Sequence, residues 1–197
     1  KVMYRKPLMM VVIILSFLAL SKSAFSTVSG TWEVYGTVTA RVTIRGHSGS
    51  SSVDFADEFT FEADGQFSMI DFDGTWTETK RNFWVFIDSE ELEDYFEENF
   101  YDQGLKVRLT VTKNVFKGKA NKLGSTISGK WNLKMSAYFY DYGLSGKISV
   151  VTTFAGTRAS SLTEGKERQF FDNALWQALL EEIQDRITGG IAQRGIQ

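Results

Sequence analysis

Few side chains in this chain could do covalent chemistry. Its 197 residues include no cysteine and a single histidine, His47, which is followed by Ser48 in a Gly/Ser-rich stretch. A serine nucleophile needs a histidine base and an acid that orients it, and the sequence around His47 has neither an elbow motif nor such an acid. Phosphate loops, dinucleotide fingerprints and His- or Cys-based metal motifs are also absent. We therefore expect no enzyme activity and no cofactor.

Acidic side chains offer the other possible chemistry. Two aspartates, Asp71 and Asp73, flank Phe72, and we interpret them as turn residues and not as a catalytic pair. The densest acidic run could bind Ca²⁺, but it lacks the twelve-residue loop spacing of such sites. We interpret it as the solvated face of a helix. The run comprises Glu90, Glu91, Glu93, Asp94, Glu97 and Glu98.

The N-terminal segment is typical of a secretory signal peptide. Basic residues between 1 and 6 precede an apolar run, Met9 to Leu20, which is shorter than the roughly 20 residues that span a bilayer. Small residues at 24 and 26 then suit a cleavage site. We predict that residues 1–26 are removed, that the protein is periplasmic or secreted, and that no transmembrane span remains. An uncleaved anchor is the alternative.

Net charge bears on the partners. The chain has 22 Lys and Arg and 24 Asp and Glu, and four of the basic residues belong to the predicted signal. The remaining 18 basic residues give the predicted mature chain a net charge of −6. Such a chain with no basic run is a poor partner for nucleic acid or anionic lipid. Without disulfides, its stability must come from a hydrophobic core.

Alternating apolar and polar residues predict strands along most of the chain. The alternation is nearly strict from Trp32 to Arg45, and Gly36 offers a place to bend. A Gly/Ser loop is predicted at 47–52, and Asp64-Gly65 predicts a tight hairpin turn. Further alternation reaches Phe154 and ends at Arg158. With eight or nine strands and hairpin connections, we expect an all-β, up-and-down antiparallel barrel.

Two segments follow a helical period instead. Residues 90–102 predict an amphipathic helix that Asp88 or Ser89 caps and Gly104 ends, inserted between strands. A second helix is predicted from Thr163 to about Thr188, ending at Gly189-Gly190. Its apolar stripe must pack on something: the outside wall of the barrel or its mouth, a second copy of the chain, or a membrane surface. The stripe comprises Phe171, Leu175, Leu179, Ile183 and Ile187.

Repeated Gly-x-Trp triplets give the chain a family resemblance. Gly30-Thr31-Trp32, Gly74-Thr75-Trp76 and Gly129-Lys130-Trp131 are all expected at strand starts. With the Asp-Gly hairpin ahead of the second, residues 29–158 resemble bacterial lipocalin-like domains of the calycin group. The resemblance implies that Trp32 packs across the barrel floor with Arg158 over it, and that a small hydrophobic ligand is bound. The helix at 90–102 departs from the usual pattern.

Inward-facing positions give the candidate site. We interpret Trp32, Trp76, Trp131 and Arg158 as residues that close the barrel. Eight other side chains could line an apolar cavity, and the alternative is that they fill the barrel completely. These are Phe59, Phe61, Phe67, Met69, Leu133, Met135, Phe139 and Phe154.

These observations lead to one functional hypothesis and two alternatives. We expect a signal peptide at 1–26, a lipocalin-like barrel at 27–158 and a helical extension at 159–197. The barrel would bind a small apolar or amphipathic ligand without catalysis. One alternative is a structural module that forms homo-oligomers through the Phe171–Ile187 helix or a strand edge. The other is an inhibitor that binds a protein through loops such as His47–Ser52.

Overall fold

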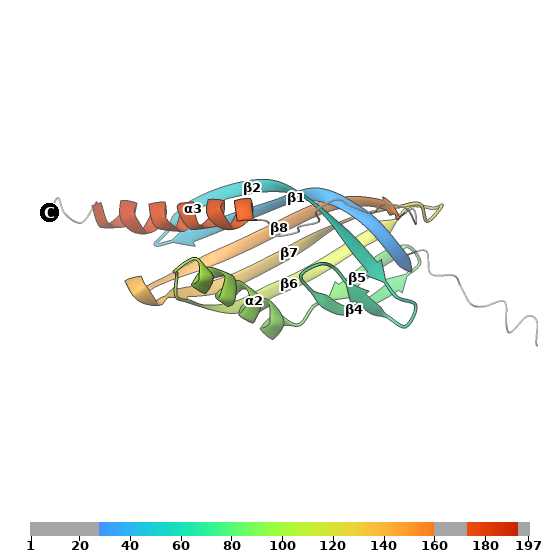
Figure 1. Cartoon of the computed structure of the whole chain (residues 1–197), viewed down its shortest axis with the longest axis horizontal. Helices are drawn as coiled ribbons and strands as arrows, with labels where there is room; N and C mark the ends of the chain where they lie inside the picture. The colour runs from blue at the N-terminus through green and yellow to red at the C-terminus, as the bar shows by residue number, and fades with distance from the viewer. Residues whose placement is uncertain (1–27, 160–172, 193–197) are drawn as a thin grey trace, which may run out of the picture.

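Eight antiparallel strands form a closed ring in the computed structural model, which describes residues 28–159 and 173–192. Each strand pairs with the next along the chain, and β1 pairs with β8 to close the ring. This confirms the predicted all-β, up-and-down barrel with an inserted and a C-terminal helix (Figure 1). The strands are β1 (Gly30–Ile44), β2 (His47–Phe61), β3 (Gln66–Ser68), β4 (Asp73–Thr79), β5 (Asn82–Phe86), β6 (Val107–Ala120), β7 (Thr126–Phe139) and β8 (Leu144–Arg158).

The ring is complete at one end only. Strands β3, β4 and β5 have 3, 7 and 5 residues, whereas the other five have 14 or 15. Strand β2 pairs with β3 only at Thr60 and Phe61, and β5 pairs with β6 only along 82–85. We call the part completed by β3–β5 the closed end. In the rest, the open half, five long strands in the order β2-β1-β8-β7-β6 form a curved sheet.

Helix α2 (Ser89–Asp102) covers the free edge of β6 in the open half. The Asp88 carboxylate accepts a hydrogen bond from the Glu90 N–H at 2.7 Å, so the predicted cap is present. Glu97 accepts a hydrogen bond from the backbone N–H of Leu109, and Glu93 accepts one from Val111, both at 2.6 Å. Two edge N–H groups that lack a strand partner are thereby satisfied.

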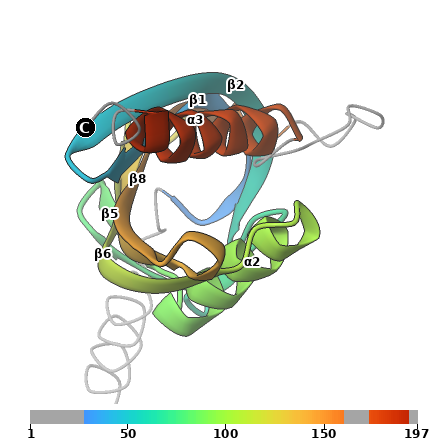
Figure 2. The ribbon, with the colours of Figure 1, turned by 90° about the vertical axis from the view of Figure 1, so that its left-hand side faces the viewer.

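Helix α3 (Asn173–Ala192) lies inside the arc of β1 and β2, on the concave face of the sheet (Figure 2). Gly49 on β2 makes this approach possible, because a Cβ there would overlap the carboxylate of Glu182. The helix continues past Gly189-Gly190, so the predicted end was wrong. Glycine costs only about 1 kcal/mol inside a helix and does not force a stop. The predicted start at Thr163 lies outside the described residues, as do Phe171 and the signal peptide.

Two further expectations from the sequence were wrong. The stretch 47–52 is the first part of β2 and not a loop, because its serines pair with β1. Ser48 and Ser52 share hydrogen bonds of 2.7 and 2.8 Å with threonines of β1. Gly129 lies within β7 and not at its start. Among the described helices, none is long and apolar enough to cross a membrane.

Candidate functional site: the barrel interior

The closed end is packed with aromatic rings. Phe59 lies at the centre, and its ring centroid is 5.6 Å from Phe67 and 5.3 Å from Phe154. Phe61 lies 5.1 Å from Phe67 and 5.2 Å from Trp76. Most of these pairs have the edge-to-face geometry that aromatic rings prefer. Four of the eight predicted cavity residues therefore contact one another and form a packed floor.

The three Gly-x-Trp tryptophans belong to this framework, and protein atoms satisfy each indole N–H. Trp32 donates to the Val28 carbonyl at 2.7 Å, and Trp76 donates to the Glu62 carbonyl at 2.9 Å. Trp131 donates to the Asn114 side chain at 2.8 Å. With their polar groups used in this way, these rings offer a bound molecule apolar surface only.

Arg158 lies over Trp32, with its Cζ 4.5 Å from the ring centroid. It donates hydrogen bonds to the carbonyls of Gly124 and Ser29, at 2.7 and 2.8 Å. Gly30 leaves room for the guanidinium, which a Cβ at that position would overlap. This arrangement ties the first and last strands together at the closed end.

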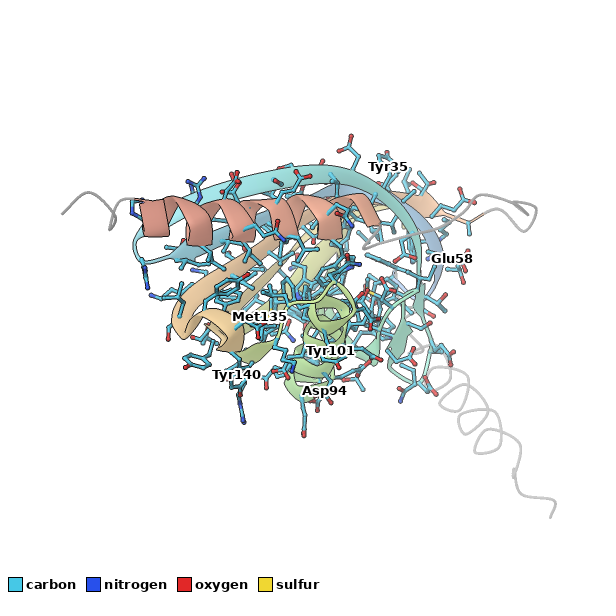
Figure 3. The ribbon with its side chains drawn as sticks, turned by 60° about the vertical axis from the view of Figure 1, so that its left-hand side comes forward. Tyr35, Glu58, Asp94, Tyr101, Met135 and Tyr140 are labelled. Atoms are coloured by element: carbon cyan, nitrogen blue, oxygen red, sulfur yellow. The ribbon has the colours of Figure 1, made fainter. Side chains whose placement is uncertain are left out.

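Three of the four remaining candidate residues face the open half. Leu133, Met135 and Phe139 alternate along β7 on the concave face, each at most 1% exposed. Met135 lies among the side chains between the sheet and α2 (Figure 3). Met69 is buried in the loop between β3 and β4. Apart from Met69, the structure therefore divides the predicted cavity residues between a packed aromatic floor and a sheet face that the two helices cover.

Both helices contribute apolar side chains to the open half. Helix α2 buries Leu92, Phe96 and Phe100. The Trp176 ring of α3 lies 5.4 Å from Phe96 and 5.3 Å from Phe100. This contact joins the helices over the sheet. Further buried residues of α3 are Leu179, Leu180, Ile183 and Ile187.

A polar side chain inside the barrel was missed as a candidate from the sequence. Thr152 on β8 is 1% exposed and lies between inward-facing Val38 on β1 and Trp131 on β7. Its hydroxyl has no hydrogen-bond partner among the residues that the structure describes. Leaving a buried hydroxyl unpaired costs about 1–3 kcal/mol. The signal that could have found it is a polar side chain at an inward position of an apolar alternation, and Asp57 on β2 shows the same signal.

A second polar group lies where α2, α3 and the loop before β4 meet. The Tyr95 hydroxyl hydrogen bonds with the side chains of Asp71 and Trp176. Burial raises the pKa of Tyr95 far above its ordinary value, and the charge of Asp71 and its hydrogen bond raise it further. The hydrogen bond from Trp176 acts in the opposite direction and is a smaller effect. The hydroxyl therefore stays protonated and joins the three segments. Asp71 is thus part of this network and is not paired with exposed Asp73.

The other candidate chemistry is dispersed. The acidic run lies along α2, where Asp94 points away from the barrel (Figure 3). His47 is exposed at the start of β2. Within residues 28–159 and 173–192, no three His, Cys, Asp or Glu side chains gather as a metal site would require.

No protein-family model and no curated protein matches this chain. Among solved structures, it is similar to a protein of unknown function from the DUF3598 family of Nostoc punctiforme PCC 73102. The identity is 10% and the TM-score 0.25, over 64% of this chain and 47% of that one, so the chain spans about half of its length. It is also similar to a DUF1329 family protein from Desulfovibrio piger ATCC 29098, with 8% identity and a TM-score of 0.21 over 81% and 95% of the two chains. Likenesses this weak carry no argument about function.

Proposed function

We propose that this protein is an exported, lipocalin-like binding protein without catalytic activity. Its ligand is one small apolar or amphipathic molecule, held in the open half between the concave sheet and the two helices. The carrying observation is the buried Thr152 hydroxyl, which has no hydrogen-bond partner in the described part of the chain. A mostly apolar site with a few placed polar groups is typical of small-molecule pockets.

The way in which the open half is covered supports this proposal. Helix α3 is not part of the strand ladder, and its described contacts with the sheet and α2 are mainly apolar. Displacing it would break side-chain packing but no β-ladder hydrogen bonds. A ligand could then replace the apolar contacts of residues such as Ile183 with its own chain, while its polar group bonds to Thr152.

Thr152 provides the test, with a dansyl-labelled fatty acid as the probe. We expect one probe to bind per chain, and Thr152→Val to weaken binding about 3- to 10-fold, the value of one neutral hydrogen bond. The same variant should raise the free energy of unfolding of the empty protein, because it removes an unpaired hydroxyl. Thr152→Ser is the matched control and should bind nearly as well as the native chain.

If Thr152→Val binds the probe more weakly but is more stable than the native chain, the loss of binding comes from the missing hydroxyl contact and not from a damaged fold. Equal probe binding by the native chain and Thr152→Val would contradict the proposed site. Native mass spectrometry of protein isolated from its own compartment supplies the second measurement. If neither a bound small molecule nor probe binding is found, the proposed function is wrong.

A further inference from the structure

The outer surface of β5 to β8 carries an unusual concentration of positive charge. No residue of these four strands is Asp or Glu. Apart from Arg158 at the end of β8, seven basic side chains of β6, β7 and β8 are exposed, and none of the seven forms an ion pair with a described residue. We call this surface the basic wall. It comprises Arg108, Lys113, Lys117, Lys119, Lys130, Lys134 and Lys147.

The register of the sheet places several of these lysines side by side. Lys117 lies directly opposite Lys130, and Lys113 lies directly opposite Lys134, on adjacent strands. Neighbouring strands are about 4.8 Å apart, and like charges directly opposite each other destabilise a sheet. A negatively charged partner would remove this repulsion and gain attraction from both members of each pair.

Exposed apolar side chains accompany the charge. Trp84 and Phe86 point outward from β5 and are 36% and 57% exposed, and Trp84 lies opposite Lys117. Trp84, Lys117, Lys119 and Lys130 line one depression of about 410 Å³. The other four tryptophans of the chain are each at most 8% exposed, so Trp84 is the exception.

Although the net charge of the chain predicts a poor partner for anionic lipid, the sheet gathers these basic side chains on one face, and we propose that the basic wall docks on a bilayer surface rich in anionic phospholipid. The lysine ammonium groups would contact headgroup phosphates, and Trp84 and Phe86 would enter the interfacial region, where amphipathic rings are favoured. The exposed Trp84 ring beside Lys117 favours a bilayer over duplex nucleic acid, because the bases of a duplex are already stacked on one another and offer an indole no apolar surface to enter. This inference is independent of a ligand inside the barrel.

Sedimentation with phosphatidylglycerol and phosphatidylcholine vesicles tests the proposal on the whole chain. We expect binding to phosphatidylglycerol that weakens with salt. A Lys near an anionic surface contributes a factor of about five, so Lys117→Glu with Lys130→Glu should lower binding at least about 25-fold. Arg45→Glu with Lys106→Glu changes the net charge equally at exposed positions outside the wall and should lower it much less.

Trp84 reports the orientation directly. Residues 1–27 contain no tryptophan, so quenching by brominated lipid cannot come from that apolar segment. We expect quenching in phosphatidylglycerol vesicles that Trp84→Phe abolishes. The proposal is overturned if brominated lipid does not quench Trp84, or if the protein binds phosphatidylglycerol and phosphatidylcholine vesicles equally. It is also overturned if the double variant outside the wall loses as much binding as Lys117→Glu with Lys130→Glu. Salt-sensitive binding to duplex DNA without vesicle binding would also overturn it.

Discussion

Single polar residues at inward positions distinguish this interior from a uniform apolar core. Tyr95 bonds to Asp71 and Trp176, and thereby joins α2 to α3 and to the loop before β4. Burial and the charge of Asp71 both disfavour the phenolate form of Tyr95. The stability that the Tyr95 hydroxyl contributes should therefore fall at alkaline pH and stay constant around neutral pH.

Replacing Tyr95 with Phe tests this junction. We expect a loss of about 1 kcal/mol of unfolding free energy at neutral pH, because the hydroxyl and its bonds are removed. The pKa of Tyr95 is raised on folding, so its stabilising contribution is complete below the unfolded value of about 10 and falls above it. Urea unfolding from pH 7 to 11 should show the difference between the native and variant proteins shrinking above about pH 10.

A tyrosine on the same helix provides the control. Tyr101 is 63% exposed, and Tyr101→Phe should change stability little at any pH. If the native protein and Tyr95→Phe differ by the same amount at pH 7 and pH 11, the junction does not depend on the Tyr95 proton.

At the scale of elements, α2 lies beside the part of β6 that the short strand β5 does not reach, where the sheet would otherwise end in an unpaired edge. A helix cannot extend a ladder, but two of its carboxylates reach the unpaired backbone N–H groups of Leu109 and Val111. This gives the acidic helix a structural role along the face where Glu93 and Glu97 lie. Glu98, next in sequence, is exposed and points to a different surface.

This difference between neighbouring glutamates is testable. Glu97→Ala should lower the free energy of unfolding by about 1–2 kcal/mol, because it removes a charge-assisted hydrogen bond. It should also speed hydrogen exchange at the Leu109 amide. Glu98→Ala should change stability by less than about 0.5 kcal/mol. Equal effects of the two substitutions would show that Glu97 contributes no more than general helix charge.

At the scale of the whole molecule, the described helix α3 uses its apolar side chains within its own chain. Leu179, Ile183 and Ile187 are each at most 2% exposed. An oligomer formed through this stripe would need α3 to leave the concave face. We therefore expect static light scattering to give a monomer mass that does not change with protein concentration. A concentration-dependent dimer that is lost on removal of residues 160–197 would instead support assembly through the C-terminal helix.

The fold was largely predictable from particular sequence patterns. Alternation along Trp32–Arg45 and the helical spacing at 90–102 predicted a strand and a helix that the structure confirms. The stretch 47–52 was misjudged, because serine and glycine favour loops locally and pairing with β1 outweighs that preference. The candidate site was less predictable. Periodicity identifies inward residues such as Phe59 and Met135 but not which of them meet in space.

By itself, the sequence determined the all-β class, the inserted acidic helix and the inward set of aromatic residues. These depend on alternation and turn chemistry, which are local along the chain. The tertiary structure decided that the barrel closes at one end, that α3 covers the other half, and that the buried Thr152 hydroxyl has no hydrogen-bond partner among the described residues. It also assembled the basic wall in a chain that is acidic overall. Every second side chain of a strand points to the same face of the sheet, and strand pairing brings the outward lysines of β6, β7 and β8 together on that face. Such contacts join residues that are distant in sequence, and composition does not record them.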